Sequence, residues 1–237
     1  MNCQEILKKF ESQKNQKNID GMARFGINPK SKIFGVPVPE IRKLAKQIKK
    51  DHKLALELFD SGFHEARLLA TMIAVPKEFT KQQFEKWVKL FDSWDIVDQA
   101  CMNLFCRSEI AVKKISELAK YKREFEKRTA FSLIAALSVH NKEMKDKDFI
   151  KYFSLIKKFS NDERNFVKKA VNWSLRQIGK RNKNLNKEAL KLAKEIFETA
   201  ERTRSKSAKW IAKNAITELE GENVQKRLKN LKNEIVC

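Results

Sequence analysis

The sequence predicts an all-α chain, an α-solenoid built from antiparallel helix pairs. Apolar residues recur at helical spacing through nearly every segment of the 237 residues. The breaks between segments are short, and the 6 glycines and 4 prolines are too few for the turns of a sheet protein. The helices follow one another without a continuous heptad pattern, which indicates stacked helix pairs rather than a coiled coil.

The N-terminal half is predicted to alternate helices with short breaks. Residues 18–27 are expected to form a loop or a short helix, and residues 29–37 are the least helical stretch. Within that stretch, residues 33–36 would suit a short strand, but a lone strand has nothing to pair with. The other predicted helices are 4–14, a helix opened by Pro39, 54–59, 65–75, a helix capped by Thr80, and one capped by Asp92 or Ser93.

The C-terminal half continues the pattern and brings the total to about thirteen helices. Trp94, Arg128 and Trp173 follow one another at spacings of 34 and 45 residues, near the ~40-residue length of HEAT or armadillo repeats. We expect one repeat domain over residues 1–237, with N-terminal helices and a loop in 1–36 and a capping helix in 221–237. The predicted helices here are 110–118, 123–139, 148–159, 163–178, 186–199, 205–219 and 224–235.

The charge is strongly basic, with 51 Lys and Arg against 30 Asp and Glu and a net charge of +21. Residues 151–237 alone carry 22 basic and 10 acidic side chains. Such an excess suits a polyanion such as DNA, RNA or an anionic membrane, and it predicts a basic concave face. The alternative is a chain from a Lys-rich proteome, whose solvated helix faces are filled with lysine.

Several classes of protein are disfavoured by what the sequence lacks. Cys3, Cys101, Cys106 and Cys237 form no CxxC pair, which argues against a zinc site and a disulfide framework and predicts a reducing, cytoplasmic location. No signal peptide, membrane span, phosphate-binding loop or zinc-protease motif is present, so we expect no membrane, no metal and no cofactor. The histidines His52, His64 and His140 fall in or beside predicted loops and are expected at the surface.

The most informative stretch is residues 93–102, Ser-Trp-Asp-Ile-Val-Asp-Gln-Ala-Cys-Met. As a helix it places Trp94, Asp98, Cys101 and Phe105 on one face. An unpaired carboxylate on an apolar face costs several kcal/mol, roughly, in lost solvation. Either a cation arrives from elsewhere in the chain, or the face is open and the cation is the ligand. We favour the second interpretation.

Two further positions resemble parts of a binding cleft. Arg128 lies between Phe125 and Phe131 on an apolar face, where it would either pair with Asp98 or Glu124 or hold a phosphate. Trp173 shares a helix face with Phe166 and Ala170, which is typical of a core residue or of an aromatic in a groove. A basic rim surrounds it, as nucleic-acid surfaces require. The rim residues are Lys168, Lys169, Arg176, Lys180 and Arg181.

These segments together resemble the AlkD-like family of DNA alkylation-repair glycosylases. The resemblance lies in Ser-Trp-Asp-x-Val-Asp at 93–98, Lys-Arg-Thr-Ala at 127–130 and Lys-Lys-Ala-Val-x-Trp-x-Leu-Arg at 168–176. The segments Gly21–Ile27 and Phe34–Arg42 are also similar to that family. The resemblance implies HEAT-like repeats around duplex DNA and excision of cationic alkylated purines such as 7-methylguanine or 3-methyladenine. It also implies that the target base need not be flipped out, so that bulky lesions are tolerated.

The resemblance also assigns roles to individual residues. It implies that Asp98 is the catalytic carboxylate, that Trp94 and Trp173 are the cleft tryptophans and that Arg128 is the cleft arginine. Where the family prototype has a tyrosine, this chain has Phe25, which keeps an aromatic face but no hydroxyl. The residues expected to contact DNA are Phe25, Arg42, Lys127, Lys168, Lys169, Arg176, Lys180 and Arg181.

The chemistry is consistent with so small a set of groups. Glycoside hydrolysis usually needs two carboxylates, one of them an acid for the leaving group. An N7- or N3-alkylated purine is already cationic and leaves as a neutral base, so a single carboxylate facing the sugar suffices. We expect a monomer that binds alkylated duplex DNA. The alternative function is a non-catalytic HEAT-like module that binds nucleic acid or protein.

Overall fold

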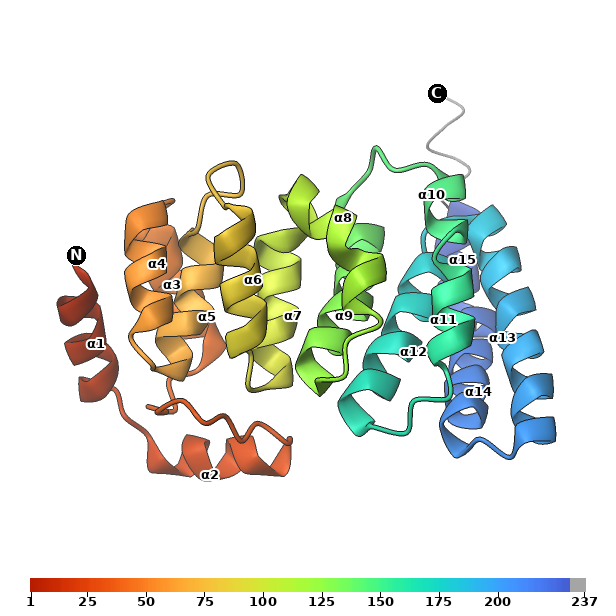
Figure 1. Ribbon diagram of the computed structural model, residues 1–237, viewed down its shortest axis with the longest axis horizontal. Helices are drawn as coiled ribbons and strands as arrows, with labels where there is room; N and C mark the ends of the chain where they lie inside the picture. The colour runs from red at the N-terminus through yellow and green to blue at the C-terminus, as the bar shows by residue number, and fades with distance from the viewer. Residues whose placement is uncertain (231–237) are drawn as a thin grey trace. The chain divides into compact units, whose positions relative to one another are not determined.

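The computed structural model describes residues 1–230 of the chain, and these residues form α-helices joined by short loops (Figure 1). The chain divides into two compact units, one ending at Lys113 and one beginning at Lys114, with the boundary inside α8 (Glu109–Leu118). The all-α solenoid class is confirmed. The single domain with subdivisions at residues 36 and 221 stays a prediction, as does the basic concave face.

In the first unit, α5 is the central helix: it packs against α3, α4 and α7, and α1 contacts both α4 and α5. Its buried residues include Leu68, Leu69 and Ile73. The α2 helix runs crosswise to α3, α4 and α5 in Figure 1 and has no buried residue. The elements are α1 (Cys3–Ser12), α2 (Gln16–Arg24), α3 (Val38–Ile48), α4 (His52–Asp60), α5 (His64–Ile73), α6 (Lys81–Leu90), α7 (Trp94–Asn103) and a short 3-10 helix (Phe105–Arg107).

Local sequence explains where these helices begin. Thr80 caps α6 as predicted, and with Gln83 it forms a capping box, in which each side chain bonds the other residue's backbone N–H. Of the two residues predicted to cap α7, Asp92 and Ser93, it is Ser93 that occupies the cap position. Its hydroxyl donates to Asp95 instead of capping a backbone N–H.

In the second unit, α12 is the central helix: it packs against α9, α11, α13 and α14, and α14 also contacts α13 and α15. Val167, Val171, Leu175 and Ile178 form its buried stripe. The elements are α9 (Glu124–His140), α10 (Asp146–Ile150), α11 (Phe153–Phe159), α12 (Asn165–Gly179), α13 (Lys183–Thr203), α14 (Lys206–Glu220) and α15 (Glu222–Asn230).

Some predicted boundaries were wrong in this unit. The single helix expected over 148–159 is two helices, because the chain turns at Lys151 and Tyr152 and lets Phe149 and Ile156 enter the core separately. The helix expected over 186–199 runs from Lys183 to Thr203, since Asn182 caps it with a side-chain bond to the Leu185 N–H. The predicted helix over 224–235 lies partly outside the described residues.

The segment between α2 and α3 is irregular but firmly held. The buried Glu65 carboxylate accepts the backbone N–H groups of Phe34 (3.0 Å), Gly35 (2.6 Å) and Val36 (3.3 Å). Residues 33–36 therefore form no strand, and the nearby β-type contact is an isolated bridge between Lys32 and Phe63. A buried carboxylate replaces the sheet partner that this segment lacks.

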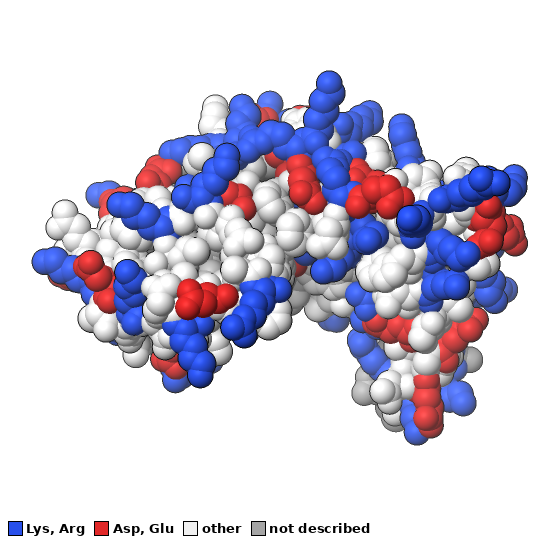
Figure 2. Space-filling view, turned by 90° about the horizontal axis from the view of Figure 1, so that it is seen from below, with Lys and Arg blue, Asp and Glu red and all other residues white. Residues whose placement is uncertain are grey.

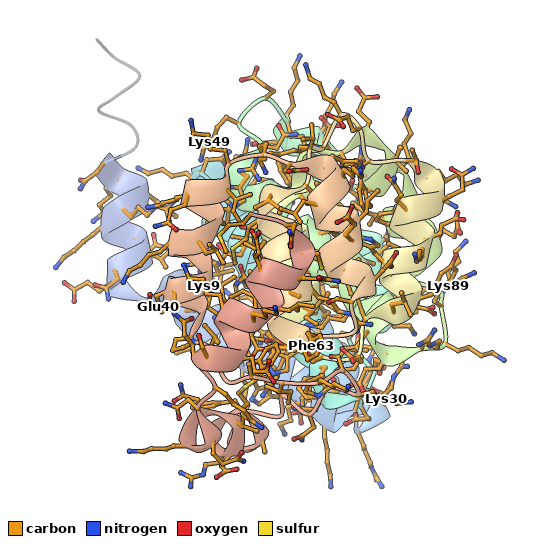
Figure 3. The ribbon with its side chains drawn as sticks, turned by 90° about the vertical axis from the view of Figure 1, so that its left-hand side faces the viewer. Lys9, Lys30, Glu40, Lys49, Phe63 and Lys89 are labelled. Atoms are coloured by element: carbon orange, nitrogen blue, oxygen red, sulfur yellow. The ribbon has the colours of Figure 1, made fainter. Side chains whose placement is uncertain are left out.

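Aromatic packing adds to this anchoring. The rings of Phe34 and Phe63 stack with centroids 4.7 Å apart, and Phe10 lies 6.3 Å from Phe34. In Figure 3, Phe63 lies among the side chains near this loop, whereas Lys9, Lys30 and Lys89 extend from the outside of the molecule. The loop thus turns the Phe34 ring toward an aromatic cluster in the interior.

Replacing Gly35 by alanine should destabilise the protein by about 2–4 kcal/mol. Gly35 has a φ of +78°, and a Cβ there would lie 2.4 Å from the Asn15 carbonyl oxygen. Urea denaturation measures the change in the free energy of unfolding.

Two glycines serve as controls. Gly62 also has a positive φ, +80°, but a Cβ there meets no atom within 4 Å, so Gly62→Ala should cost only about 1 kcal/mol. Gly21 lies inside α2 with open space around it, and Gly21→Ala should be neutral or slightly stabilising. Equal losses for Gly35→Ala and Gly62→Ala would contradict the close approach to Asn15.

Candidate functional site

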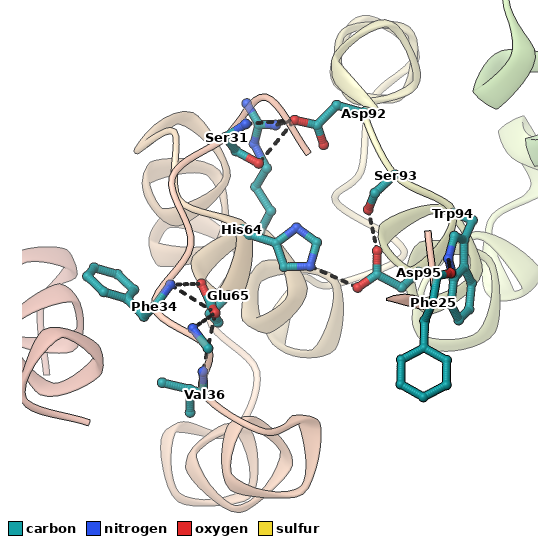
Figure 4. A network of polar contacts seen from close by, with 12 residues as sticks. Phe25, Ser31, Phe34, Val36, His64, Glu65, Asp92, Ser93, Trp94 and Asp95 are labelled. Atoms are coloured by element: carbon teal, nitrogen blue, oxygen red, sulfur yellow. Dashed lines mark hydrogen bonds and ion pairs between the residues drawn. The ribbon is translucent and has the colours of Figure 1, made fainter. Parts of the chain in front are cut away.

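Trp94, the first residue of α7, is held by a segment far away in the sequence. Its indole Nε1–H donates to the backbone carbonyl of Phe25, at 3.0 Å (Figure 4). Phe25 ends α2, and its own ring is 74% exposed. Trp94 is half-buried. The contact therefore fixes the indole edge in the protein and brings the two aromatic residues predicted in the first unit together.

Asp98 lies one turn after Trp94 on α7 and is also half-buried. Cys101 and Phe105 are fully buried, but α7 ends at Asn103 and Phe105 belongs to the following 3-10 helix. The prediction that all four share one helical face was wrong at Phe105. Trp94 and Asp98 are the pair that reaches the surface, and partial exposure lowers the cost of keeping a carboxylate there.

A buried histidine stabilises the start of α7. His64 is 0% exposed, and its Nε2 lies 2.8 Å from the Asp95 carboxylate, which also accepts the Ser93 hydroxyl (Figure 4). The prediction that His64 is at the surface was wrong: it is the first residue of α5, and α5 is buried at that end. Sequence reasoning also missed Asp95, although an acidic residue in the first turn of a helix is a recognisable signal.

A second carboxylate links the same loop to α7. Asp92 accepts the backbone N–H and the hydroxyl of Ser31, each at 3.0 Å, and Arg67 lies 3.5 Å from the same oxygen. His64 also donates its backbone N–H to the Lys32 carbonyl, at 2.8 Å. Loop residues 31–36 are thus tied to the start of both α5 and α7, the helix that carries Trp94 and Asp98.

The ionisation of Asp95 follows from this setting. Burial by itself raises the pKa of Asp95. The hydrogen bond and charge of His64 act in the opposite direction, together with bonds from Ser93 and the Ile96 N–H, and the pKa ends below its ordinary value. The carboxylate is therefore ionised in the folded protein at neutral pH and acts as a hydrogen-bond acceptor.

In the second unit, Arg128 and Trp173 lie on the adjacent helices α9 and α12. Arg128 is 5% exposed and its Nη1 donates to the Phe166 carbonyl, at 2.6 Å. The Phe166 N–H in turn donates to Glu124, at 3.1 Å. Trp173 is half-buried, two turns further along α12. Arg128 thus holds the first turn of the helix that carries Trp173.

Four of the predicted DNA contacts have partners within the second unit. Lys127 pairs with Asp162 at 3.2 Å and lies 4.5 Å from the Phe159 ring centroid. Arg176 and Lys180 both pair with Glu218. Arg181 donates to the carbonyls of Ser138, Lys142 and Met144. Their role in DNA binding remains untested, but the structure gives each a structural role that the sequence did not indicate.

Burial and these pairs set the ionisation of the two acidic partners. Burial raises the pKa of Asp162 and that of Glu218. The bonds from Arg164 and Lys127 to Asp162, and from Lys180 and Arg176 to Glu218, outweigh this and leave both pKa values lowered. The two carboxylates therefore stay charged and neutralise the cations around them.

The remaining predicted DNA contacts are more accessible. Arg42 on α3 and Lys169 on α12 are exposed, and Lys168 is half-buried. Residues 1–113 carry 20 basic and 14 acidic side chains, so the rest of the chain accounts for +15 of the net +21. Lys and Arg side chains are spread over the face shown in Figure 2, with Asp and Glu among them. The positive charge is thus concentrated in the second half of the sequence.

Among residues 1–230, no group of three or more His, Cys, Asp and Glu side chains is placed to hold a metal ion. Within the same part of the chain, none of the helices has the length and apolar character needed to cross a bilayer.

Comparisons with known proteins agree with this architecture. A family model described as "DNA alkylation repair enzyme" matches residues 6–219. A solved structure described as "a new family of proteins related to the HEAT-like repeat DNA glycosylases with affinity for branched DNA structures" superposes with a TM-score of 0.72 at 20% identity, covering 82% of this chain and 83% of that one. A designed armadillo repeat protein in complex with a (KR)4 peptide matches more loosely, with a TM-score of 0.38 at 14% identity, over 80% and 79% of the chains. The search of curated proteins gave no match.

Replacing Asp95 by asparagine should destabilise the protein at pH 7 by roughly 1–3 kcal/mol, because the buried charged acceptor is lost. The pKa of Asp95 is lower in the folded than in the unfolded chain. The stability that Asp95 contributes is therefore fully present at pH values above its pKa in the unfolded chain, about 3.9. It is lost as the pH falls through the lower pKa of the folded protein. The stability difference between wild type and variant should shrink below about pH 4.

Urea denaturation of both proteins between pH 7 and pH 3 measures this difference. Asp60→Asn is the matched control, because Asp60 pairs with Lys86 at the surface and about half of each side chain is exposed. That variant should change stability little at any pH. A difference for Asp95→Asn that stays constant down to pH 3 would show that folding does not lower the pKa of this carboxyl group.

Proposed function

This chain belongs to the DNA alkylation repair enzyme family, and from that premise we propose that it hydrolyses the N-glycosidic bond of cationic alkylated purines, such as 7-methylguanine and 3-methyladenine, in duplex DNA. One observation carries the proposal. The Trp94 indole is held by the Phe25 carbonyl one helical turn before the Asp98 carboxylate, and both side chains are half-buried. This pairing of a fixed aromatic ring and a carboxylate suits a cationic substrate.

The proposed reaction needs little from the protein because the substrate is activated. Alkylation at N7 or N3 gives the purine a positive charge, so the C1′–N bond breaks with its electrons moving to the base, which leaves neutral. The deoxyribose becomes cationic as the bond breaks. Asp98 stabilises that charge and orients the water that adds to C1′, and the proton of this water passes to solvent. Electrostatic stabilisation of this kind is commonly the largest catalytic contribution.

Trp94 adds a second stabilising group. The negative π face of an indole attracts a cation, a contact worth up to about 2 kcal/mol when it is desolvated. The bond to Phe25 restricts ring rotation, so little entropy is lost when the substrate binds. Phe25 supplies a further exposed aromatic surface next to this position. The lesion is recognised by its charge and not by its shape, which supports a tolerance of bulky adducts.

The second unit supplies the remaining proposed contacts. We assign Arg128 to a backbone phosphate and Trp173 to stacking against the sugar or base, each as a separate proposal. Lys168 and Lys169, near the start of α12, are assigned to phosphates, as is Arg42 on α3 in the first unit. We place the protein with the nucleoid in the cytoplasm, because a repair enzyme acts where the damaged DNA is. We also propose that it acts as a monomer.

A non-catalytic DNA-binding module is the second candidate. It is favoured by the relative of similar fold, whose description gives affinity for branched DNA structures. The fold is compatible with either function, because activity depends on a few residues and not on the solenoid. Binding of alkylated duplex without any release of base would favour the module.

Asp98→Asn should reduce release of 7-methylguanine from alkylated duplex by at least about a hundredfold, because the amide cannot stabilise a cationic sugar. Affinity for DNA should stay similar or rise, since a negative charge is removed from the binding surface. Chromatography of the released bases measures the first quantity and fluorescence anisotropy of a labelled duplex measures the second.

Asp60→Asn removes a carboxylate from the surface of α4 and serves as the control, with wild-type release expected. If Asp98→Asn released the base at the wild-type rate, the catalytic assignment of Asp98 would be wrong. If neither wild type nor control released any base, the second candidate function would be preferred.

Arg128→Ala should weaken DNA binding and reduce the slope of log affinity against log salt by about 0.9, the amount for one phosphate contact. Arg123→Ala is the control, because Arg123 immediately precedes α9 and is exposed. Loss of the bond to Phe166 also destabilises α12, so thermal unfolding of both variants is measured first. An unchanged salt slope in a folded Arg128→Ala protein would exclude the phosphate contact.

A further inference from the structure

Trp210 on α14 is the most exposed of the 4 tryptophans, with 41% of its surface accessible. Trp87 is fully buried in the first unit, and Trp94 and Trp173 are half-buried. An isolated exposed apolar residue is normal on a helix. The surroundings of Trp210 are the reason to give it a role, because they are basic.

The surroundings are set by the way α12 and α14 pack. Lys168 on α12 places its Nζ 5.3 Å from the centroid of the Trp210 ring. The Ser207 hydroxyl donates to the Asp162 carbonyl near the start of α12, and Arg176 pairs with Glu218 near the ends of both helices. The two helices therefore run side by side in the same direction. Lys168 and Trp210 therefore lie next to each other near the N-terminal ends of the two helices, within the second unit.

We define the α12–α14 surface by the exposed or half-buried residues that share it. Lys206 and Lys213 lie four residues before and three after Trp210 on α14, so each is one turn from the indole. Lys169 follows Lys168 on α12. The surface comprises Lys168, Lys169, Lys206, Trp210 and Lys213.

Charge is unevenly distributed along these two helices. Toward their C-terminal ends, Arg176 and Lys180 are neutralised by Glu218. Toward their N-terminal ends, no ion pair to a residue within 1–230 is found for Lys168, Lys169, Lys206 or Lys213, whereas the neighbouring Lys209 pairs with Glu201 at 2.7 Å. The uncompensated lysines are thus the ones beside the exposed indole.

We propose that the α12–α14 surface binds a single-stranded DNA segment next to the duplex that carries the lesion. The lysines suit a phosphate backbone, and an exposed indole stacks on a base that is not paired. A continuous duplex hides its base faces inside the stack, so Trp210 would gain little from it. An acidic protein segment would satisfy the lysines but offers a flat ring only where it carries an aromatic residue, whereas every unpaired nucleotide carries a base. The inference rests on the proposed function, from which it takes DNA as the ligand.

The test uses the full-length protein and undamaged DNA. Fluorescence anisotropy compares a blunt duplex with the same duplex extended by a single-stranded tail of about ten nucleotides, within the range that such surfaces cover. Wild type should bind the tailed duplex about five- to tenfold more tightly. Trp210→Ala should abolish that preference, and Trp210→Phe should retain most of it. Leu90→Ala, which removes an exposed apolar side chain from α6 in the first unit, should leave both affinities unchanged.

A second readout covers the case in which Trp210→Ala does not fold. The tail should quench the tryptophan fluorescence of wild type more than that of Trp210→Phe. Equal quenching in the two proteins, equal affinity of wild type for the two DNAs, or a preference that survives in Trp210→Ala would each overturn the proposal. So would displacement of the tailed DNA by poly-glutamate as readily as by a single strand.

Release of 7-methylguanine from a blunt alkylated duplex by wild type is measured in parallel. Its absence would overturn the proposed function and not this inference, because the binding comparison uses DNA without lesions. Normal base release without a preference for the tail would overturn this inference alone.

Discussion

The Glu65 carboxylate is the interaction on which the N-terminal part of the structure depends. The segment between α2 and α3 has no strand or helix partner for its backbone, and three successive N–H groups find their acceptor in this one buried side chain. Leaving such groups unpaired in the interior would cost several kcal/mol, roughly. Because Glu65 and Asp92 both hold this loop against α5 and α7, the end of α2 is confined, and the Phe25 carbonyl is available to Trp94.

The two units use buried charge in opposite ways. In the first, carboxylates on or beside the helices accept hydrogen bonds from loop backbone and from His64, and they organise irregular chain. In the second, cations on α9 and α12 are satisfied by Asp162, Glu218 and backbone carbonyls. A basic sequence can therefore be misleading, because part of its charge is used to hold helices together. The charge available to a polyanion is the part left on exposed lysines.

The proposed chemistry and the architecture fit each other for a physical reason. A substrate that carries its own positive charge needs neither a general acid nor a metal to leave, so a fixed ring and one carboxylate can form the reactive part of a site. Such a site requires only that one helix be held in place. The contacts of Asp92, Asp95 and His64 hold the start of α7 in place. In the proposed complex, the rest of the solenoid supplies separate surfaces for paired and unpaired DNA.

The sequence by itself determined the class of the fold and most helix positions. It also identified four candidates for the functional site: Trp94, Asp98, Arg128 and Trp173. Both results rest on local properties, namely helical periodicity and the placement of a charge on an apolar face. It did not reveal that His64 is buried, that Phe105 leaves the α7 face, or that Lys127 and Arg176 have acidic partners. Each of these depends on residues more than 30 positions away, or on where a helix ends against its neighbours. Only tertiary packing decides which charges meet a partner and which remain exposed to a ligand.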